Sequence, residues 1–159
     1  MSEPSTPRPP NRVHVEWAGD RRFDAGRPGG PTLRLDGDGD TAQGPVDAVL
    51  SALASCVSVD VVDILAKRRT PVERLAIDVT GERVTTIPRR LRRVLLDFYI
   101  DGAGIERQQA ERAIDLSISK YCSVRDSLAP DIEVEWTLTL NGEPGVLINQ
   151  AGSPQPAVR

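Results

Sequence analysis

Cys56 and Cys122 are the only cysteines of the 159-residue chain and its candidate nucleophiles. They are far apart in the sequence and form no CxxC motif, so a disulfide framework is not indicated. If they meet in the fold, a Cys56 thiolate stabilised by a nearby cation could attack a peroxide oxygen and become a sulfenic acid, which Cys122 could convert to a disulfide. That reaction requires the two Cα atoms to come within about 5.5 Å. The alternative is that both are small core residues, because free cysteine is among the most buried residue types.

Other residue types make several alternative chemistries unfavourable. The single histidine, His14, lies in an alternating segment that places Val13, Val15 and Trp17 on the opposite face, so His14 is expected to face solvent. A Ser-His-Asp triad is therefore unattractive, and a closed zinc site within one chain is short of ligands. The loop 36–44 resembles part of a calcium loop but lacks the downstream glutamate. We expect no metal and no cofactor.

The charge balance indicates which partners the chain is suited to bind. The formal net charge is -3, so there is no broad positive field for nucleic acid or an anionic membrane surface. The densest charge cluster, residues 89–93, carries four arginines without interleaved aromatic side chains. It is interpreted as a solvated turn and strand edge. Small molecules or proteins are the expected partners.

The ends of the chain differ in composition from its middle. Residues 1–12 are rich in proline and predict a disordered N-terminal tail, and residues 142–159 predict a flexible C-terminal tail. Residues 13–141 have the length of one domain. The N-terminus lacks a signal pattern, and no stretch is expected to have the ~20 apolar residues of a membrane span. A cytoplasmic protein is expected.

Local patterns predict the elements that must position the cysteines. Residues 13–18, 21–25 and 32–36 predict three short strands separated by glycine-containing turns. A helix over 46–66 follows, then two strands around 75–79 and 94–100 joined near Ile87-Pro88, a helix over about 105–121 and a strand over 134–140. The order βββ-α-ββ-α-β predicts an α+β fold with helices on one face of a sheet.

The helix predicted over 46–66 is apolar on every side. Pro45 suits its first turn and Lys67 its last, and Pro71 ends it. A helix that is apolar all round must be buried all round. Because a domain of this size has little interior, a second subunit is expected to supply the rest of the burial, which predicts a homodimer.

Two motifs resemble a known family. The segment 44–56, GPVDAVLSALASC, with 59–65, resembles the central helix of the OsmC/Ohr family of osmotically inducible and organic hydroperoxide resistance proteins. The segments 113–117 and 120–124 resemble the helix that carries the second cysteine of that family. The likeness covers about residues 13–140.

The resemblance implies an OsmC-like fold and a redox activity. It implies an intertwined homodimer, with sheets wrapped around two central helices and two active sites at the subunit interface. It also implies thiol-dependent reduction of hydroperoxides, often organic ones, by a dithiol or thiol reductant, without a metal or cofactor. In that activity Cys56 would be the peroxidatic cysteine and Cys122 the resolving cysteine.

The sequence departs from the family pattern at the acid that orients the activating arginine. In the organic hydroperoxide branch of the family a glutamate ten residues before the first cysteine clamps an activating arginine, but here that position is Val46. The next residue, Asp47, matches an OsmC-like branch. On a helix this offset turns the side chain by ~100°. Asp47 is therefore either an orienting acid or a partner of the helix dipole.

The activating arginine is expected in the N-terminal strands, where Arg21, Arg22 and Arg27 are the candidates. Arg22 is favoured because strand alternation places it opposite Arg21. Asp60, one turn after Cys56, is unfavourable for a thiolate because an unpaired carboxylate would raise the thiol pKa.

Two other functions remain open. The same dimer could bind a small apolar ligand between its helices, with the cysteines as redox sensors. It could also be a purely structural dimer in which the cysteines only pack.

Overall fold

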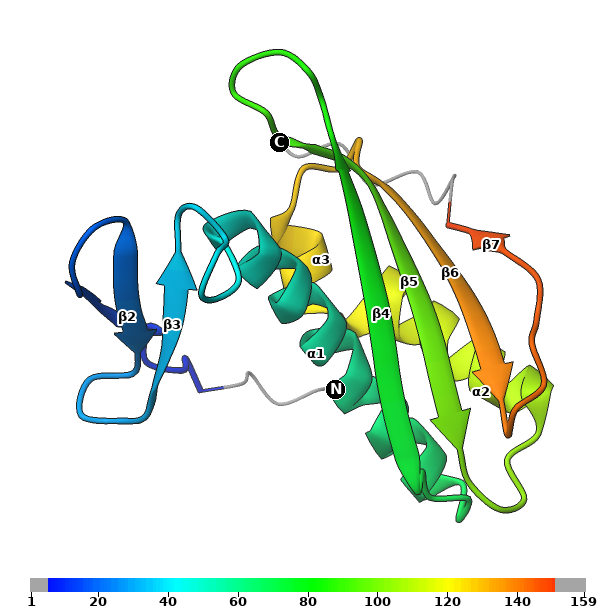
Figure 1. The fold of residues 1–159 in the computed structure, drawn as a ribbon. Coiled ribbons are helices and arrows are strands. Elements are labelled where there is room, and N and C mark those ends of the chain that lie inside the picture. The colour runs from blue at the N-terminus through cyan, green and yellow to red at the C-terminus, as the bar shows by residue number, and fades with distance from the viewer. Residues whose placement is uncertain (1–5, 151–159) are drawn as a thin grey trace. The chain divides into compact units, whose positions relative to one another are not determined.

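The computed structural model describes residues 6–150 (Figure 1). The outer parts of the two predicted tails, residues 1–5 and 151–159, lie outside the described residues. The structure divides into two compact units between Ala48 and Val49, and the single domain expected over residues 13–141 remains a prediction. The predicted α+β class and the order βββ-α-ββ-α-β are both confirmed, with two further short helical segments and one further strand.

The first unit is an antiparallel meander of three strands. The strands are β1 His14–Trp17, β2 Arg22–Gly26 and β3 Thr32–Asp36, in the order β1-β2-β3. All four residues of β1, His14 among them, are exposed. Most large apolar side chains of the meander are also exposed, namely Val13, Val15, Trp17, Phe23 and Leu33, whereas Leu35 is half-buried. The described part of this unit therefore contains almost no core of its own.

The second unit is built on a four-stranded sheet. Its strands are β4 Arg74–Arg83, β5 Leu91–Asp101, β6 Glu133–Leu140 and β7 Ile148–Asn149, in that order. In β5 the alternate residues Val94, Leu96, Phe98 and Ile100 are fully buried, as the period of two requires for a sheet covered on one face. Strands β5 and β6 are parallel, so the chain between them must cross the sheet, and it does so through the helices that carry Cys122.

Strand β7 lies in the segment that was expected to be a flexible tail. Ile148 pairs with Trp136 and Asn149 with Glu135, antiparallel to β6. The expectation of a tail from residue 142 is corrected for these two residues. A two-residue strand carries no periodic pattern of its own, and it is stabilised by the sheet edge to which it is added.

Helix α1, Pro45–Lys67, has well-formed ends. Pro45 occupies the first helical position, where its missing N–H leaves no hydrogen bond unmade. At the other end Arg69 adopts a positive φ of 62°, and the N–H groups of Arg69 and Thr70 donate to the carbonyls of Ala66 and Leu65. This is the Schellman arrangement, here without the usual glycine.

One face of α1 packs on the sheet. Leu53, Val57, Val61 and Leu65, four residues apart, are fully buried. Figure 1 shows α1 and the next helix, α2, on the same face of strands β4 to β6. The opposite face of α1 is exposed, with Val59 at 62% and Val62 at 41%. The expectation that α1 is buried on all sides is thus wrong for the single chain, whose sheet can cover only one side of a helix.

By length and composition alone, α1 could cross a membrane, and no other helix within residues 6–150 could. This corrects the expectation that no stretch has the length of a span. Core helices of soluble proteins meet the same criteria. Because α1 places one apolar face against the sheet, we interpret it as such a core helix.

The second predicted helix changes its winding before Cys122. Helix α2, Arg107–Leu116, is followed by a π-helical turn, η1 Ser117–Tyr121, and then by the short helix α3 Ser123–Ser127. A regular helix would continue the apolar pattern to Tyr121, but Tyr121 is exposed and Cys122 is buried. The π-helical turn accommodates one extra residue, so the inward position moves from residue 121 to residue 122.

Candidate active site

Cys122 lies in a buried turn where two helical segments meet. Its N–H donates to the carbonyl of Ser117 at 2.8 Å, which closes the π-helical turn, and the Ser117 hydroxyl donates to Ala113 at 2.7 Å. Cys122 is also the N-cap of α3, and its sulfur accepts a hydrogen bond from the backbone N–H of Arg125 at 3.3 Å. The side chain is only 3% exposed. The turn therefore fixes the direction of the Cys122 sulfur.

The structure brings the two cysteine side chains together. Cys56 comes from the middle of α1 and is half-buried, and both thiols are free. Burial raises the pKa of Cys122 to about 11, the backbone N–H groups of Arg125 and Val124 oppose the rise, and a hydrogen bond and Coulombic interaction with Cys56 add to it. Cys122 therefore stays protonated near neutral pH and can donate its S–H to the Cys56 sulfur.

Arg125 is a functional candidate that was not predicted from the sequence. Its guanidinium donates from Nη2 to the carbonyl of Ile132 at 3.1 Å and from Nη1 to that of Ala129 at 3.4 Å. Burial lowers the pKa of Arg125, while Coulombic interactions with Asp126 and Cys122 raise it. The sequence feature that could have identified it is a basic residue three positions after Cys122. An N-cap side chain accepts a hydrogen bond from the backbone N–H of the second or third helical residue, and Arg125 is the third.

Asp47 is placed at the N-terminus of α1. Its Oδ2 accepts the backbone N–H of Gly44 at 2.8 Å, which is one half of a capping box. Of the two roles left open by the sequence, the described contacts show the helix-terminal one. They show no ion pair between Asp47 and an arginine within residues 6–150.

Arg22 is paired with carboxylates of the meander. Its Nη2 lies 2.5 Å from Oδ2 of Asp20, and its charge contributes to the lowered pKa of Asp36, the residue opposite it on β3. Arg21 is more exposed and pairs with Asp38 at 2.8 Å. Because Arg22 and Cys56 belong to different units, Arg22 as activator remains a prediction.

The polar loop after β3 is organised around the buried carboxylate of Asp36. Its oxygens accept the N–H of Asp38 and the N–H and hydroxyl of Thr41 at 3.0, 3.0 and 2.7 Å. These bonds, first that from the Thr41 hydroxyl, lower the pKa of Asp36 to about 2. No group of three or more potential metal ligands occurs within residues 6–150. We interpret the Asp36 carboxylate as an internal acceptor that shapes the loop.

We expect Asp36→Asn to destabilise the chain in a pH-dependent way. The carboxylate stabilises the fold fully above its ordinary pKa of 3.8, and this contribution is lost as the pH falls toward about 2. The unfolding temperatures of wild type and variant should therefore differ most near neutral pH and converge in that acid range. Asp40→Asn, at an exposed position of the same loop, is the control and should change little. A difference that is independent of pH would contradict the assignment.

Asp60, the acid one turn after Cys56, forms no ion pair with another described residue.

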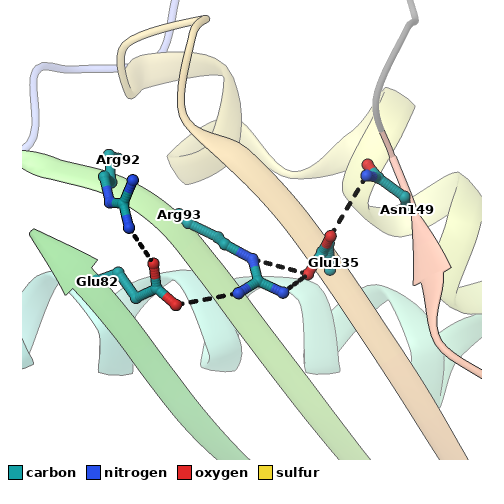
Figure 2. Close-up of polar contacts among 5 residues, drawn as sticks. All are labelled: Glu82, Arg92, Arg93, Glu135 and Asn149. Carbon is teal, nitrogen blue, oxygen red and sulfur yellow. Dashed lines mark hydrogen bonds and ion pairs between the residues drawn. The ribbon is translucent and has the colours of Figure 1, made fainter.

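The arginine cluster of residues 89–93 is, in contrast, largely paired. Arg92 and Arg93 both contact Glu82, and Arg93 also binds the buried Glu135, which accepts from Asn149 (Figure 2).

Arg90 pairs with Asp131 at 2.5 Å. The three arginines, their carboxylate partners and Glu133 line a hollow of about 470 Å³. We interpret this network as a lock on the register of β4, β5 and β6.

Comparison with known proteins agrees with this architecture. A family model described as "OsmC-like protein" matches residues 37–137. The Escherichia coli K12 protein YhfA is 35% identical over 114 residues, which cover 71% of this chain and 85% of YhfA.

Solved structures share the fold at lower sequence identity. The OsmC-like protein of Mycoplasma pneumoniae has a TM-score of 0.69 and 22% identity, covering 81% of this chain and 95% of that one. The organic hydroperoxide resistance protein OhrB of Bacillus subtilis has a TM-score of 0.53 and 13% identity, covering 81% and 96%. The family model and the identity to YhfA establish that this chain belongs to the OsmC-like protein family.

Proposed function

We propose that this chain is a thiol-dependent peroxidase that reduces organic hydroperoxides, with Cys56 as the peroxidatic cysteine and Cys122 as the resolving cysteine. The observation that carries the proposal is the contact between these two thiols, one half-buried on α1 and one buried and protonated after η1. A half-buried sulfur can be reached by a peroxide, whereas a buried one is better suited to react with its neighbour.

The proposed reaction has three steps. The Cys56 thiolate attacks the outer peroxide oxygen, so the O–O bond breaks, an alcohol leaves after protonation and Cys56 becomes a sulfenic acid. The Cys122 sulfur then attacks the Cys56 sulfur, so an S–S bond forms and the hydroxyl leaves with the Cys122 proton as water. A thiol or dithiol reductant finally reduces the disulfide by exchange and is itself oxidised.

The surroundings of Cys56 support an apolar peroxide as substrate. Alanine, leucine and valine precede and follow Cys56 on α1, interspersed with Ser55, Ser58 and Asp60, and exposed apolar side chains such as Val59 continue along the helix. Apolar surface of this kind favours an alkyl group by removing it from water. We therefore propose alkyl or lipid hydroperoxides in preference to hydrogen peroxide.

We also propose that the active state is a homodimer in a reducing, cytoplasmic compartment. The exposed face of α1 and the exposed side chains of the meander are apolar surface that a second copy could cover. In such a dimer Arg22, oriented by Asp20, is our candidate for the cation that stabilises the Cys56 thiolate. Two free thiols fit a compartment that keeps cysteines reduced.

Counting thiols after exposure to peroxide tests the proposed function. Reduced protein mixed with one equivalent of cumene hydroperoxide should lose both thiols, gain one intramolecular disulfide and release one equivalent of cumyl alcohol. The same treatment with hydrogen peroxide should be slower. Unchanged thiols, with an apolar probe bound tightly, would contradict the peroxidase and favour the ligand-binding dimer.

A further inference from the structure

We propose that Arg125 is a positioning residue for the resolving thiol: it orients the Cys122 sulfur toward Cys56, and its positive charge stabilises the Cys122 thiolate as it forms. The inference deepens the proposed function and rests on it for the reaction served. The effect of Arg125 on the Cys122 thiol can nevertheless be measured without any peroxide.

The first support is the way Arg125 contacts both the sulfur and the chain beyond it. Its backbone N–H donates to the Cys122 sulfur at 3.3 Å, while its guanidinium bonds to the carbonyls of Ala129 and Ile132. These anchors join α3 to the segment that leads into β6. Arg125 is therefore held at both ends, and the position of its charge relative to the Cys122 sulfur is restricted.

The second support is that the charge of Arg125 is not neutralised by an ion pair. Arg90, Arg92 and Arg93 each contact a carboxylate, but no carboxylate within residues 6–150 forms an ion pair with Arg125. Its anchors are neutral carbonyls, and Asp126 acts on it only through a Coulombic interaction. Because Arg125 is half-buried, its charge is screened less by water than that of a surface arginine.

The third support is that the resolving step places negative charge on the Cys122 sulfur, which a nearby cation would stabilise. In the resolving step the Cys122 S–H must lose its proton to the departing hydroxyl while an S–S bond forms to Cys56. Burial opposes the charge that develops on the Cys122 sulfur. The charged or titratable groups that act on this sulfur are Cys56 from α1 and Arg125 from α3, since Lys120 and Tyr121 are exposed on η1. Arg125 is the cation among them.

The test uses a Cys56→Ser chain, in which Cys122 is the sole thiol. We expect Arg125→Gln in this chain to raise the apparent pKa of Cys122 and to slow its alkylation by iodoacetamide near neutral pH about tenfold, which corresponds to one pKa unit. Arg125→Lys keeps the charge and should restore most of the rate. In the chain with both cysteines, Arg125→Gln should slow disulfide formation and leave sulfenic acid formation unchanged.

Arg107→Gln is the matched control, because Arg107 is also half-buried and donates to two backbone carbonyls, those of Leu138 and Glu143, at 3.0 and 2.6 Å. It should leave the Cys122 titration unchanged. The proposal is overturned if Arg125→Gln does not move the titration, if Arg125→Lys does not restore it, or if Arg107→Gln has the same effect. A shifted titration in a protein that forms no sulfenic acid would support the role of the charge and reject the peroxidase.

Discussion

Replacing Cys56 with serine is expected to reduce hydroperoxide turnover to the rate of the uncatalysed reaction, whereas Cys122→Ser should stop the reaction after its first step. Removing the attacking sulfur leaves no nucleophile for the O–O bond. Without Cys122 the sulfenic acid has no internal partner, so it should persist and be trapped by dimedone. Turnover with a dithiol should then fall by at least about tenfold, because the external thiol must attack a half-buried sulfur directly.

Ser55→Ala and Ser123→Ala are the neighbouring controls, since each changes a hydroxyl next to one of the cysteines. Both variants should retain turnover, and intact-mass spectra should show the disulfide in each. If both cysteine variants reduce cumene hydroperoxide as fast as wild type, the cysteines only pack and the structural dimer is favoured. If Cys122→Ser is the more severe variant for alcohol release, the two roles are reversed.

Val59→Asp is expected to dissociate the dimer and remove activity. In the single chain Val59 is 62% exposed, so a charge there should change stability by no more than about 0.5 kcal/mol. In a dimer whose subunits meet along α1, the same carboxylate would be buried without a partner, at a cost of several kcal/mol. Sedimentation velocity should show wild type as a dimer and the variant as a monomer or an unfolded chain.

Val146→Asp provides the comparison, because Val146 is 75% exposed and lies in the segment before β7. It should remain dimeric and active. A monomeric wild type would contradict the homodimer, whereas a Val59→Asp chain that stays dimeric would contradict an interface along α1. In a monomeric protein the activating arginine would have to come from the same chain as Cys56.

Most elements were predictable because the information that sets them is local. Strand alternation in β5 and the proline at the start of α1 depend only on near neighbours in the sequence, and both predictions are confirmed. The π-helical turn η1 was not predictable in this way. An insertion of one residue into a helix leaves the apolar spacing before it unchanged, and only the contacts after it reveal the new direction.

The candidate site was predictable only in part. The importance of Cys56 and Cys122 came from their residue type and from the family resemblance, but their contact depends on α1 and η1 packing on one face of the same sheet. Asp47 illustrates the limit, since the sequence left two roles open and its contact with Gly44 shows one. Arg125 was missed because its importance arises from a turn and from the carbonyls of a later segment.

The sequence by itself determined the order of the elements and the two side chains able to do redox chemistry, because periodicity and residue type are properties of neighbouring positions. Only the tertiary structure decided which thiol is buried and protonated, and that the backbone N–H and the charge of Arg125 both act on it. Burial and charge at a sulfur depend on what lies within a few ångströms in space. At Cys122 those neighbours come from α1, from the π-helical turn and from α3.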